Sequence, residues 1–449
     1  MLRRNAGPPV MDAWRVRSAA GLTALALAAA AYAFRETLPG RLRAAMGIAA
    51  FLLVIVACSS NVRAIRWRTV AWGFGLQLVL ALLILNVSFG GVRPGYELFS
   101  AVAAVATRFL DFTNAGSTFV FGVLADPAAM GEVFPNGLVL AFSTLPVIIF
   151  ASAVFTVLYH LGLLQLGVRL MARVMMPLMG TSGAETLAAA ANVFMGQTEA
   201  PIIVRPYIPA MTRSELLALM TGGLATIAGS MFVVYVNLGA DPVAMLTTGV
   251  MAAPCGLYLA KILIPETETP ATAGGARVDV ERSHVNVIDA AAGGAADGMR
   301  LAMNVAAVLI AFLALVAMVD HGLGLLRPGL SLAGIFAVVF APVAALVGVP
   351  AADVPIVADL LGTKLVATEF VAYLKLTGEY QGIISDRAHV LSTYALTGFA
   401  NLGSIGILLG GIGGMAPERR GDLARLGSRA LLAGFAATLV NASIAALLI

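Results

Sequence analysis

The sequence has few charged residues and few of the residues that build disulfides or metal sites. Only 12% of its 449 residues are charged, about half of the roughly 25% found in soluble domains. Its two cysteines, Cys58 and Cys255, both lie in apolar stretches. The four histidines are scattered along the chain: His160, His284, His321 and His389. We therefore expect neither a disulfide framework nor a His/Cys metal site.

Hydrophobic residues make up 60% of the chain, and the mean hydropathy is +0.92. The apolar runs are long and continuous, which predicts membrane-spanning helices and disfavours the ten-residue alternation of a β-barrel. Arginines are spread among the connecting segments, as topology signals are. The net charge of +4 does not come from a basic patch interleaved with aromatics. We therefore expect an all-α polytopic membrane protein without a nucleic-acid partner.

The apolar runs predict spans near residues 19–34, 44–59, 70–87, 138–159, 214–235, 243–264 and 301–319, with a last span ending at 449. The first run is read as an uncleaved helix, and Pro146 as a kink. Residues 90–135 and 161–179 are predicted to be amphipathic or interfacial helix, and 265–298 a polar loop with a short surface helix. Arginines 63, 66 and 68 favour a cytoplasmic loop, which also places the N-terminus in the cytoplasm.

One polar stretch, residues 192–201, interrupts this apolar background with Gln197, Thr198 and Glu199. A charged residue at membrane depth costs about 2.5–3.5 kcal/mol on insertion scales, so it indicates function by default. Gly196 and Pro201 predict a helix break there, which is tolerated only where the backbone is packed in protein or lines a cavity.

The second half of the chain repeats this pattern. A short segment ends in Thr368-Glu369, as the first ends in Thr198-Glu199. Each is followed by a span interrupted by small residues, at 221–230 and at 397–406; within the first span we expect breaks at Gly222-Gly223 and at 228–230. Paired interrupted segments in two halves indicate the binding site of a secondary transporter.

The polar groups of the two halves suit a neutral ligand rich in hydroxyls or amides. The candidate set is Gln197, Thr198, Glu199, Glu369, Asn401 and Ser404, with Phe399 beside it. It lacks the Arg or Lys that a phosphate or carboxylate requires. Lys364 is interpreted as a snorkelling or paired side chain. The alternative for both glutamates is a structural carboxylate bonded to backbone N–H groups.

A second group could bind a hard monovalent cation. Asn192 and Thr226 offer side-chain oxygens close to a predicted helix break, and Met195 and Ile227 offer backbone carbonyls. The alternative is that Asn192 and Thr226 make ordinary hydrogen bonds between helices.

Several long motifs occur in an order that resembles the concentrative nucleoside transporters. They lie at residues 196–201, 205–207, 222–230, 369–373, 393–396, 398–401 and 404–407, and the likeness runs from about Thr69 to the C-terminus. The resemblance implies a homotrimer with eight core spans, an inverted repeat, two re-entrant hairpins and two broken helices. It also implies elevator-type import of nucleosides (the uridine, cytidine and adenosine class) through a multi-pass protein of the bacterial inner membrane.

The resemblance assigns roles to the candidates. The nucleobase would contact Gln197, Thr198 and Glu199. The ribose would contact Glu369, Asn401 and Ser404, with Phe399 close by. Sodium would be bound by Asn192, Met195, Thr226 and Ile227. Retention of Asn192 and Thr226 favours sodium over protons as the coupling ion. A proton-coupled permease remains the first alternative, followed by a channel. An intramembrane enzyme is disfavoured, because HExxH, GxSxG and cofactor motifs are missing.

The expected domain organisation follows from these assignments. Residues 1–43 form an N-terminal extension with an additional membrane helix, and 265–300 a polar loop. Scaffold segments are expected at 44–160, 301–349 and 413–449. The first transport-domain half spans 161–264 and the second 350–412.

Overall fold

The computed structural model describes residues 10–126, 129–130, 139–273 and 284–449. In these ranges the regular structure is helical, apart from one isolated bridge between Phe89 and Val92. The prediction of an all-helical chain is confirmed. Residues 1–9, 127–128, 131–138 and 274–283, which include parts of the expected N-terminal extension, amphipathic segment, fourth span and polar loop, lie outside the described residues.

The helices of the first half begin with α1 (Val10–Ala33), α2 (Gly40–Ala57), α3 (Trp67–Leu85) and α4 (Pro94–Phe121). They continue with α6 (Leu140–Ser143), α7 (Leu145–His160), α8 (Leu163–Met179), α9 (Gly183–Ala191), α10 (Ala200–Ile203), α11 (Arg213–Ala225), α12 (Gly229–Asn237) and α13 (Pro242–Leu263). The second half comprises α14 (Val287–Leu326), α15 (Leu332–Val339), α16 (Ala341–Val347), α17 (Val354–Val366), α18 (Glu369–Leu374), α19 (Asp386–Leu396), α20 (Leu402–Met415) and α21 (Arg420–Leu448).

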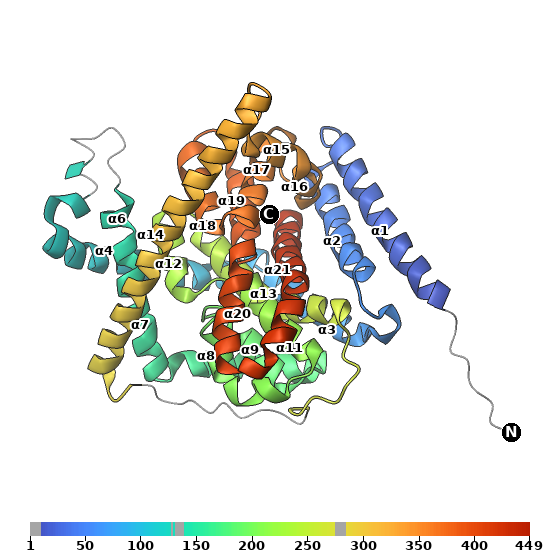
Figure 1. The fold of residues 1–449 in the computed structure, drawn as a ribbon, viewed down its shortest axis with the longest axis horizontal. Coiled ribbons are helices and arrows are strands. Elements are labelled where there is room, and N and C mark those ends of the chain that lie inside the picture. The colour runs from blue at the N-terminus through green and yellow to red at the C-terminus, as the bar shows by residue number, and fades with distance from the viewer. Residues whose placement is uncertain (1–9, 127–128, 131–138, 274–283) are drawn as a thin grey trace.

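Eight segments of the described residues are long and apolar enough to cross a membrane. They are α1, α2, α3, α6–α7, α11–α12, α13, α14 and the segment Pro417–Leu448, which contains α21. Most of the predicted spans are therefore confirmed as helices, with ends shifted by a few residues. Because α1 and α2 run in opposite directions, the start of α1 and the connection from α2 to α3 lie at the same end of the molecule (Figure 1).

The helix breaks of the structure differ in detail from the predicted ones. Gly222 and Gly223 lie inside α11, and the break falls at residues 226–228. Glycine in a buried helix permits close packing of neighbours, and Gly222 is packed against the Asn192 amide. Pro146 is in the first turn of α7, directly after the interruption at Thr144 that divides the span Ala141–His160 into α6 and α7, so the predicted kink corresponds to this interruption.

The loop predicted at 265–298 was also too long. Asn286 caps the start of α14, its side chain accepting a hydrogen bond from the Asp289 N–H. From there α14 continues for 40 residues without a stop signal. Figure 1 shows it running obliquely across the outside of the molecule, in contact with α7.

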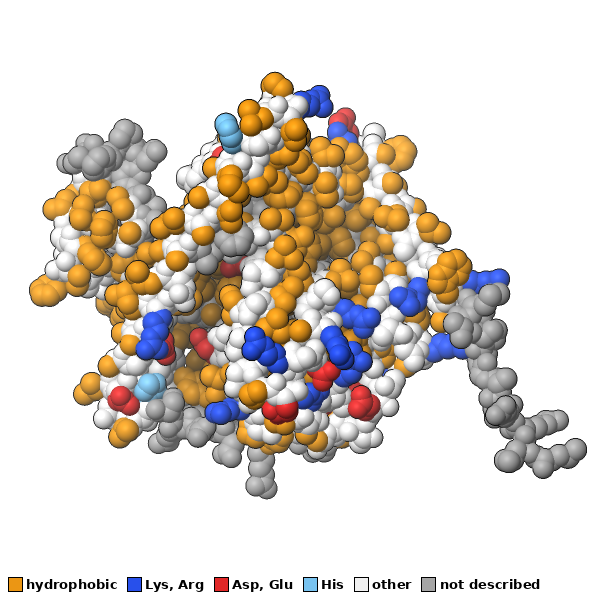
Figure 2. All heavy atoms as spheres, viewed as in Figure 1, with side chains coloured by type: hydrophobic (Ala, Val, Ile, Leu, Met, Phe, Trp, Pro, Cys, Tyr) orange, Lys and Arg blue, Asp and Glu red, His pale blue; other side chains and the backbone are white. Residues whose placement is uncertain are grey.

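The centre of the fold is made by α11, α13 and α21, which are buried along most of their length. A hydrogen-bonded chain ties α13 and α21 to α3: the Tyr258 hydroxyl donates to Gln77 Oε1 at 2.8 Å, and Gln77 Nε2 donates to Asn441 Oδ1 at 2.6 Å. Figure 2 shows apolar side chains covering the outer helices, while Lys and Arg gather toward the lower half of the view.

Candidate functional site

The two interrupted helices meet each other at their breaks. Thr226 ends α11 and Asn401 precedes α20, and the Phe399 N–H donates to the Thr226 carbonyl at 3.1 Å. Gly398 makes this approach possible, because its φ of +144° is favourable only for glycine. A Cβ at Gly398 would lie 3.0 Å from the Ala225 carbonyl oxygen and 2.7 Å from a Thr438 methyl.

Glu369 is the centre of the polar groups from the second half. It is the first residue of α18 and is only 4% exposed. The Tyr235 hydroxyl donates to its Oε1 at 2.9 Å, and Asn401 Nδ2 donates to its Oε2 at 2.8 Å. The carboxylate thus holds α12, α18 and the break before α20 together.

The chain of hydrogen bonds continues into the first half. Asn401 caps α20, with its Oδ1 accepting from the Ser404 N–H at 2.8 Å. Gln197 Nε2 donates to Ser404 Oγ at 3.5 Å, the limit of a hydrogen bond. Gln197 Oε1 is buried and has no hydrogen-bond partner. An unsatisfied buried acceptor costs about 1–3 kcal/mol, so this amide is available for a ligand.

Glu199 and Thr198 lie differently from Gln197. The Glu199 side chain is exposed, and its Oε2 accepts from the Gly196 N–H at 3.1 Å. Thr198 is half-buried and faces α20, since a Cβ on Gly411 would lie 3.1 Å from its methyl. The backbone bond to Glu199 matches the structural alternative for this carboxylate, but its exposure leaves the remaining oxygen accessible.

The candidate cation ligands lie on the other side of the first break. Asn192 is fully buried at the end of α9; its Nδ2 donates to the Ala188 carbonyl at 3.0 Å, while its Oδ1 has no hydrogen-bond partner. Thr226 is 1% exposed, and its hydroxyl donates to the Gly222 carbonyl at 2.9 Å, which leaves its lone pairs free to face a cation.

Met195 and Ile227 are both 6% exposed and border the same break. The two segments that carry them are joined by a backbone bond, from the Gly229 N–H to the Phe194 carbonyl at 3.2 Å. The structure thus places all four cation candidates in the segments around the end of α9 and the break between α11 and α12.

One functional candidate, Tyr235, was missed in the sequence, and one of the two interpretations of Lys364 was right. Tyr235 is fully buried and stacks on Tyr373 at a centroid distance of 4.5 Å. A tyrosine on an apolar helix needs a partner for its hydroxyl, which was the available signal. Lys364 is also fully buried and therefore does not snorkel; it is paired, as the other interpretation held.

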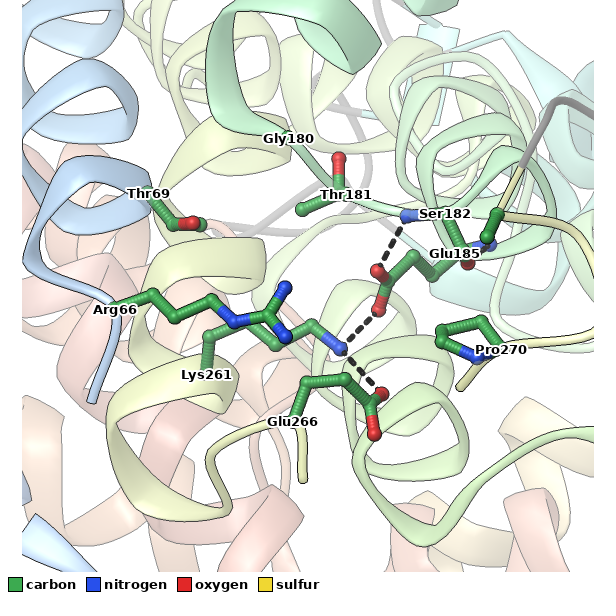
Figure 3. A pocket seen from close by; sticks show the side chains of 10 residues that line it. Arg66, Thr69, Gly180, Thr181, Ser182, Glu185, Lys261, Glu266 and Pro270 are labelled. Atoms are coloured by element: carbon green, nitrogen blue, oxygen red, sulfur yellow. Dashed lines mark hydrogen bonds and ion pairs between the residues drawn. The ribbon is translucent and has the colours of Figure 1, made fainter. Parts of the chain in front are cut away.

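A separate polar pocket of about 90 Å³ lies where α9 begins and α13 ends (Figure 3). Lys261 Nζ lies 2.6 Å from Glu185 Oε2 and 3.3 Å from Glu266 Oε2. Glu185 also accepts from the Ser182 N–H at 2.8 Å, which completes the capping box of α9. Because these carboxylates already have cationic or N–H partners, the pocket fixes helix ends and offers little to a ligand.

Comparisons with known protein families agree along nearly the whole chain. Residues 46–124 match a family profile described as "Na+ dependent nucleoside transporter N-terminus", and residues 244–446 match the corresponding C-terminus. Residues 141–242 match a profile described as "Nucleoside recognition". Together these segments contain all the candidate site residues.

Individual relatives were found among both sequences and structures. The chain is 42% identical to sodium/nucleoside cotransporter 1 of Mus musculus over 430 residues, covering 91% of this chain but 64% of that protein's length. It is 41% identical to an uncharacterized transporter of Haemophilus influenzae, covering 90% of this chain and 97% of that one. A structure of CNTnw in an inward-facing substrate-bound state is similar with a TM-score of 0.86 and 40% identity, over 91% and 97% of the two chains.

The close contact between the two helix breaks at Gly398 can be tested by adding one methyl group at this position. We expect Gly398→Ala to lower the midpoint of thermal unfolding of the purified protein, because the methyl meets Thr438 and forces a φ that costs about 1–3 kcal/mol. Gly406→Ala is the matched control, since a Cβ there meets no atom within 4 Å. Equal loss of stability in both variants would contradict the close packing described.

Proposed function

Because this chain belongs to the Na+-dependent nucleoside transporter family, we propose that it imports nucleosides together with sodium. Its relatives are transporters, which fits a chain without an enzymatic motif. The curated mammalian relatives are longer, and the chain spans 64% of the Mus musculus protein. The substrate, the ion and the assembly are therefore proposals: the substrate and the ion are argued from this chain's own residues together with the family, and the assembly from the family resemblance.

The observation that carries the proposal is the hydrogen-bonded chain from Tyr235 through Glu369, Asn401 and Ser404 to Gln197. Carboxylate, amide and hydroxyl groups in this arrangement can exchange their mutual bonds for bonds to ribose hydroxyls. A site built to bond hydroxyls rejects analogues that lack them, because its own polar groups are then left unpaired. We assign the ribose to Glu369, Asn401 and Ser404, with Phe399 alongside.

The base is assigned to the first half of the site. The unpartnered Gln197 Oε1 suits an amino or imino N–H donor of a nucleobase, and the exposed Glu199 offers a second acceptor. Thr198 adds a hydroxyl that either donates or accepts. A Cβ at Gly196 would lie 3.1 Å from the Ala228 Cβ, so the missing side chain lets these two segments approach each other. We propose adenosine as well as uridine and cytidine as substrates.

Sodium is assigned to the oxygen group around Asn192. The orphaned Asn192 Oδ1, the Thr226 hydroxyl and backbone carbonyls of Met195 and Ile227 form an oxygen-only donor set, as a hard cation requires. The orphaned oxygen favours this role over the alternative of ordinary interhelical bonding for Asn192. The family descriptions name sodium and lend no support to the proton alternative.

We further propose an inverted repeat that moves as an elevator. The pairs α9–α10 and α17–α18 would be re-entrant hairpins, each followed by a broken helix, α11–α12 or α19–α20. The mobile domain would comprise the predicted segments 161–264 and 350–412 together with α3 and α21, because α3 and α21 are hydrogen-bonded to α13, and α21 also to Lys364. The scaffold would comprise the other helices of 44–160 and 301–349. Structures of CNTnw are described as inward-facing, intermediate and outward-facing, which supports such movement.

One contact surface suits sliding between these proposed parts. A cavity of about 370 Å³ lies between α4 and α7 on one side and α12 and α13 on the other, and apolar side chains such as Phe109, Phe155, Phe232 and Val250 line it. Such surfaces form few directional bonds that would resist displacement. We place the protein as a homotrimer in lipid of the bacterial inner membrane, with α1 as a helix added to the core.

The proposal is tested by uptake into proteoliposomes. We expect radiolabelled uridine to accumulate above equilibrium with an inward sodium gradient, and not with an inward proton gradient at matched potential. Adenosine serves as the purine substrate in a parallel assay. Accumulation with protons alone would overturn the sodium assignment, and mere equilibration under every gradient would indicate a channel.

The carboxylate of the ribose site has its own prediction. We expect Glu369→Gln to lower uridine uptake at a fixed concentration by roughly 100-fold while the protein is still made, because hydrogen bonds to a charged group contribute about 1.5–3 kcal/mol each. Glu379→Gln is the control, since the Glu379 side chain is 58% exposed. Normal uptake by the Glu369 variant would remove this residue from the site.

The cation ligand is tested by the sodium dependence of uptake. We expect Asn192→Ala to raise the sodium concentration for half-maximal uptake by roughly tenfold, the equivalent of about 1.4 kcal/mol for one lost ligand. Asn237→Ala, at the end of α12 that is far from the break, is the control and should leave the sodium concentration for half-maximal uptake unchanged. An unaltered sodium dependence in the Asn192 variant would mean that the ion binds elsewhere.

A further inference from the structure

Lys364 is a fully buried lysine that the proposed nucleoside and sodium sites do not use. It lies on α17, five positions before Glu369. Its Nζ donates to the Ala395 carbonyl at 2.7 Å and to Thr438 Oγ1 at 3.0 Å, and it lies 5.4 Å from the centre of the Phe435 ring. The Thr438 hydroxyl itself donates to the Phe435 carbonyl at 2.9 Å, so it accepts from Lys364.

These surroundings are those of a bound cation. A carbonyl oxygen, a hydroxyl oxygen and an aromatic face each attract positive charge. Ala395 is in the last turn of α19, where carbonyl groups lack helical partners and the helix dipole is negative. The ammonium therefore neutralises the end of a half-helix at membrane depth.

The corresponding helix end in the first half is faced by a neutral side chain. Thr226 ends α11 as Thr397 ends α19, and each hydroxyl donates to the carbonyl four residues earlier, at 2.9 and 2.7 Å. Against the last turn of α11 lies the Asn192 amide, from the hairpin helix α9. The proposed sodium would bring to this end the positive charge that Lys364 carries in the second half.

We propose that Lys364 is a built-in cation, the counterpart in the second half of the transported sodium in the first, and that it makes the sodium-loaded carrier electrically neutral around its binding site. This inference rests on the proposed function. The site contains two carboxylates, Glu199 and Glu369, and one ammonium, Lys364. Asp359 is buried and paired with Lys375, so this buried pair adds no net charge; Glu379, which also lies 3.9 Å from Lys375, has a side chain that is 58% exposed to solvent. One sodium then cancels the remaining negative charge.

Neutrality has a consequence for movement across the membrane. Displacing a net charge through the membrane requires work against the membrane potential, and a neutral domain avoids that work. The empty carrier retains one negative charge and is sensitive to the potential, whereas the loaded carrier is not. Lys364 is thus a positioning residue that sets the net charge around the moving binding site and needs no contact with the nucleoside.

The test isolates the loaded carrier. Proteoliposomes are given saturating sodium and uridine on both sides, so that labelled uridine exchanges through loaded states only, and the membrane potential is set with potassium and valinomycin. We expect the exchange rate of the unaltered protein to be equal at inside-negative and inside-positive potentials. In Lys364→Met the loaded domain carries a negative charge, so exchange should become at least several-fold slower and depend on the sign of the potential.

Two further variants separate charge from structure. Lys364→Arg retains the charge and should keep exchange independent of potential, even if the rate falls. Thr438→Val removes a neutral hydrogen-bond partner of Lys364 and should also leave exchange independent of the membrane potential. Potential-dependent exchange by the unaltered protein, or potential-independent exchange by Lys364→Met, would overturn the inference. Failure of the unaltered protein to exchange uridine in sodium would instead refute the proposed function itself, so the two failures are distinguishable.

Discussion

The contact on which the site depends is the junction of the two helix breaks. The hydrogen bond from the Phe399 N–H to the Thr226 carbonyl is a single backbone interaction, but it positions both halves. The proposed cation ligands Thr226 and Ile227 belong to the first break. The proposed ribose ligands Asn401 and Ser404 belong to the second break. Breaks of this kind are tolerated at membrane depth only when other parts of the protein satisfy the freed backbone groups. Here each break provides partners for the other.

This arrangement would couple the two proposed ligands. Both ligands would bind to segments joined at one junction. If the first ligand orders this junction, the second no longer bears that entropy cost and binds more tightly. Thermodynamic linkage then requires that sodium raise the affinity for nucleoside by the same factor as nucleoside raises the affinity for sodium. Such reciprocity is the equilibrium basis of cotransport, because it suppresses partly loaded carriers.

Much of this organisation could be predicted from the sequence, because the membrane leaves few structural options. Continuous apolar runs determined most helices, and the costly polar residues Gln197, Glu199 and Glu369 identified the segments of the site. The exact break could not be predicted, since Gly222 and Gly229 look alike in sequence, and the close packing of Gly222 against Asn192 inside α11 depends on residues 30 positions apart. Tyr235 was missed for a similar reason: its partner Glu369 is 134 positions away.

The length of α14 has a physical consequence for the surrounding membrane. A helix of 40 residues extends about 60 Å, twice the roughly 30 Å thickness of a hydrocarbon core. Figure 1 shows α14 crossing its neighbouring helices obliquely, and a tilted helix spans less membrane thickness than an upright one. Tilt of this kind changes with bilayer thickness at a small energetic cost. Because α14 packs along α7, a change in bilayer thickness would change the tilt of both helices relative to the membrane.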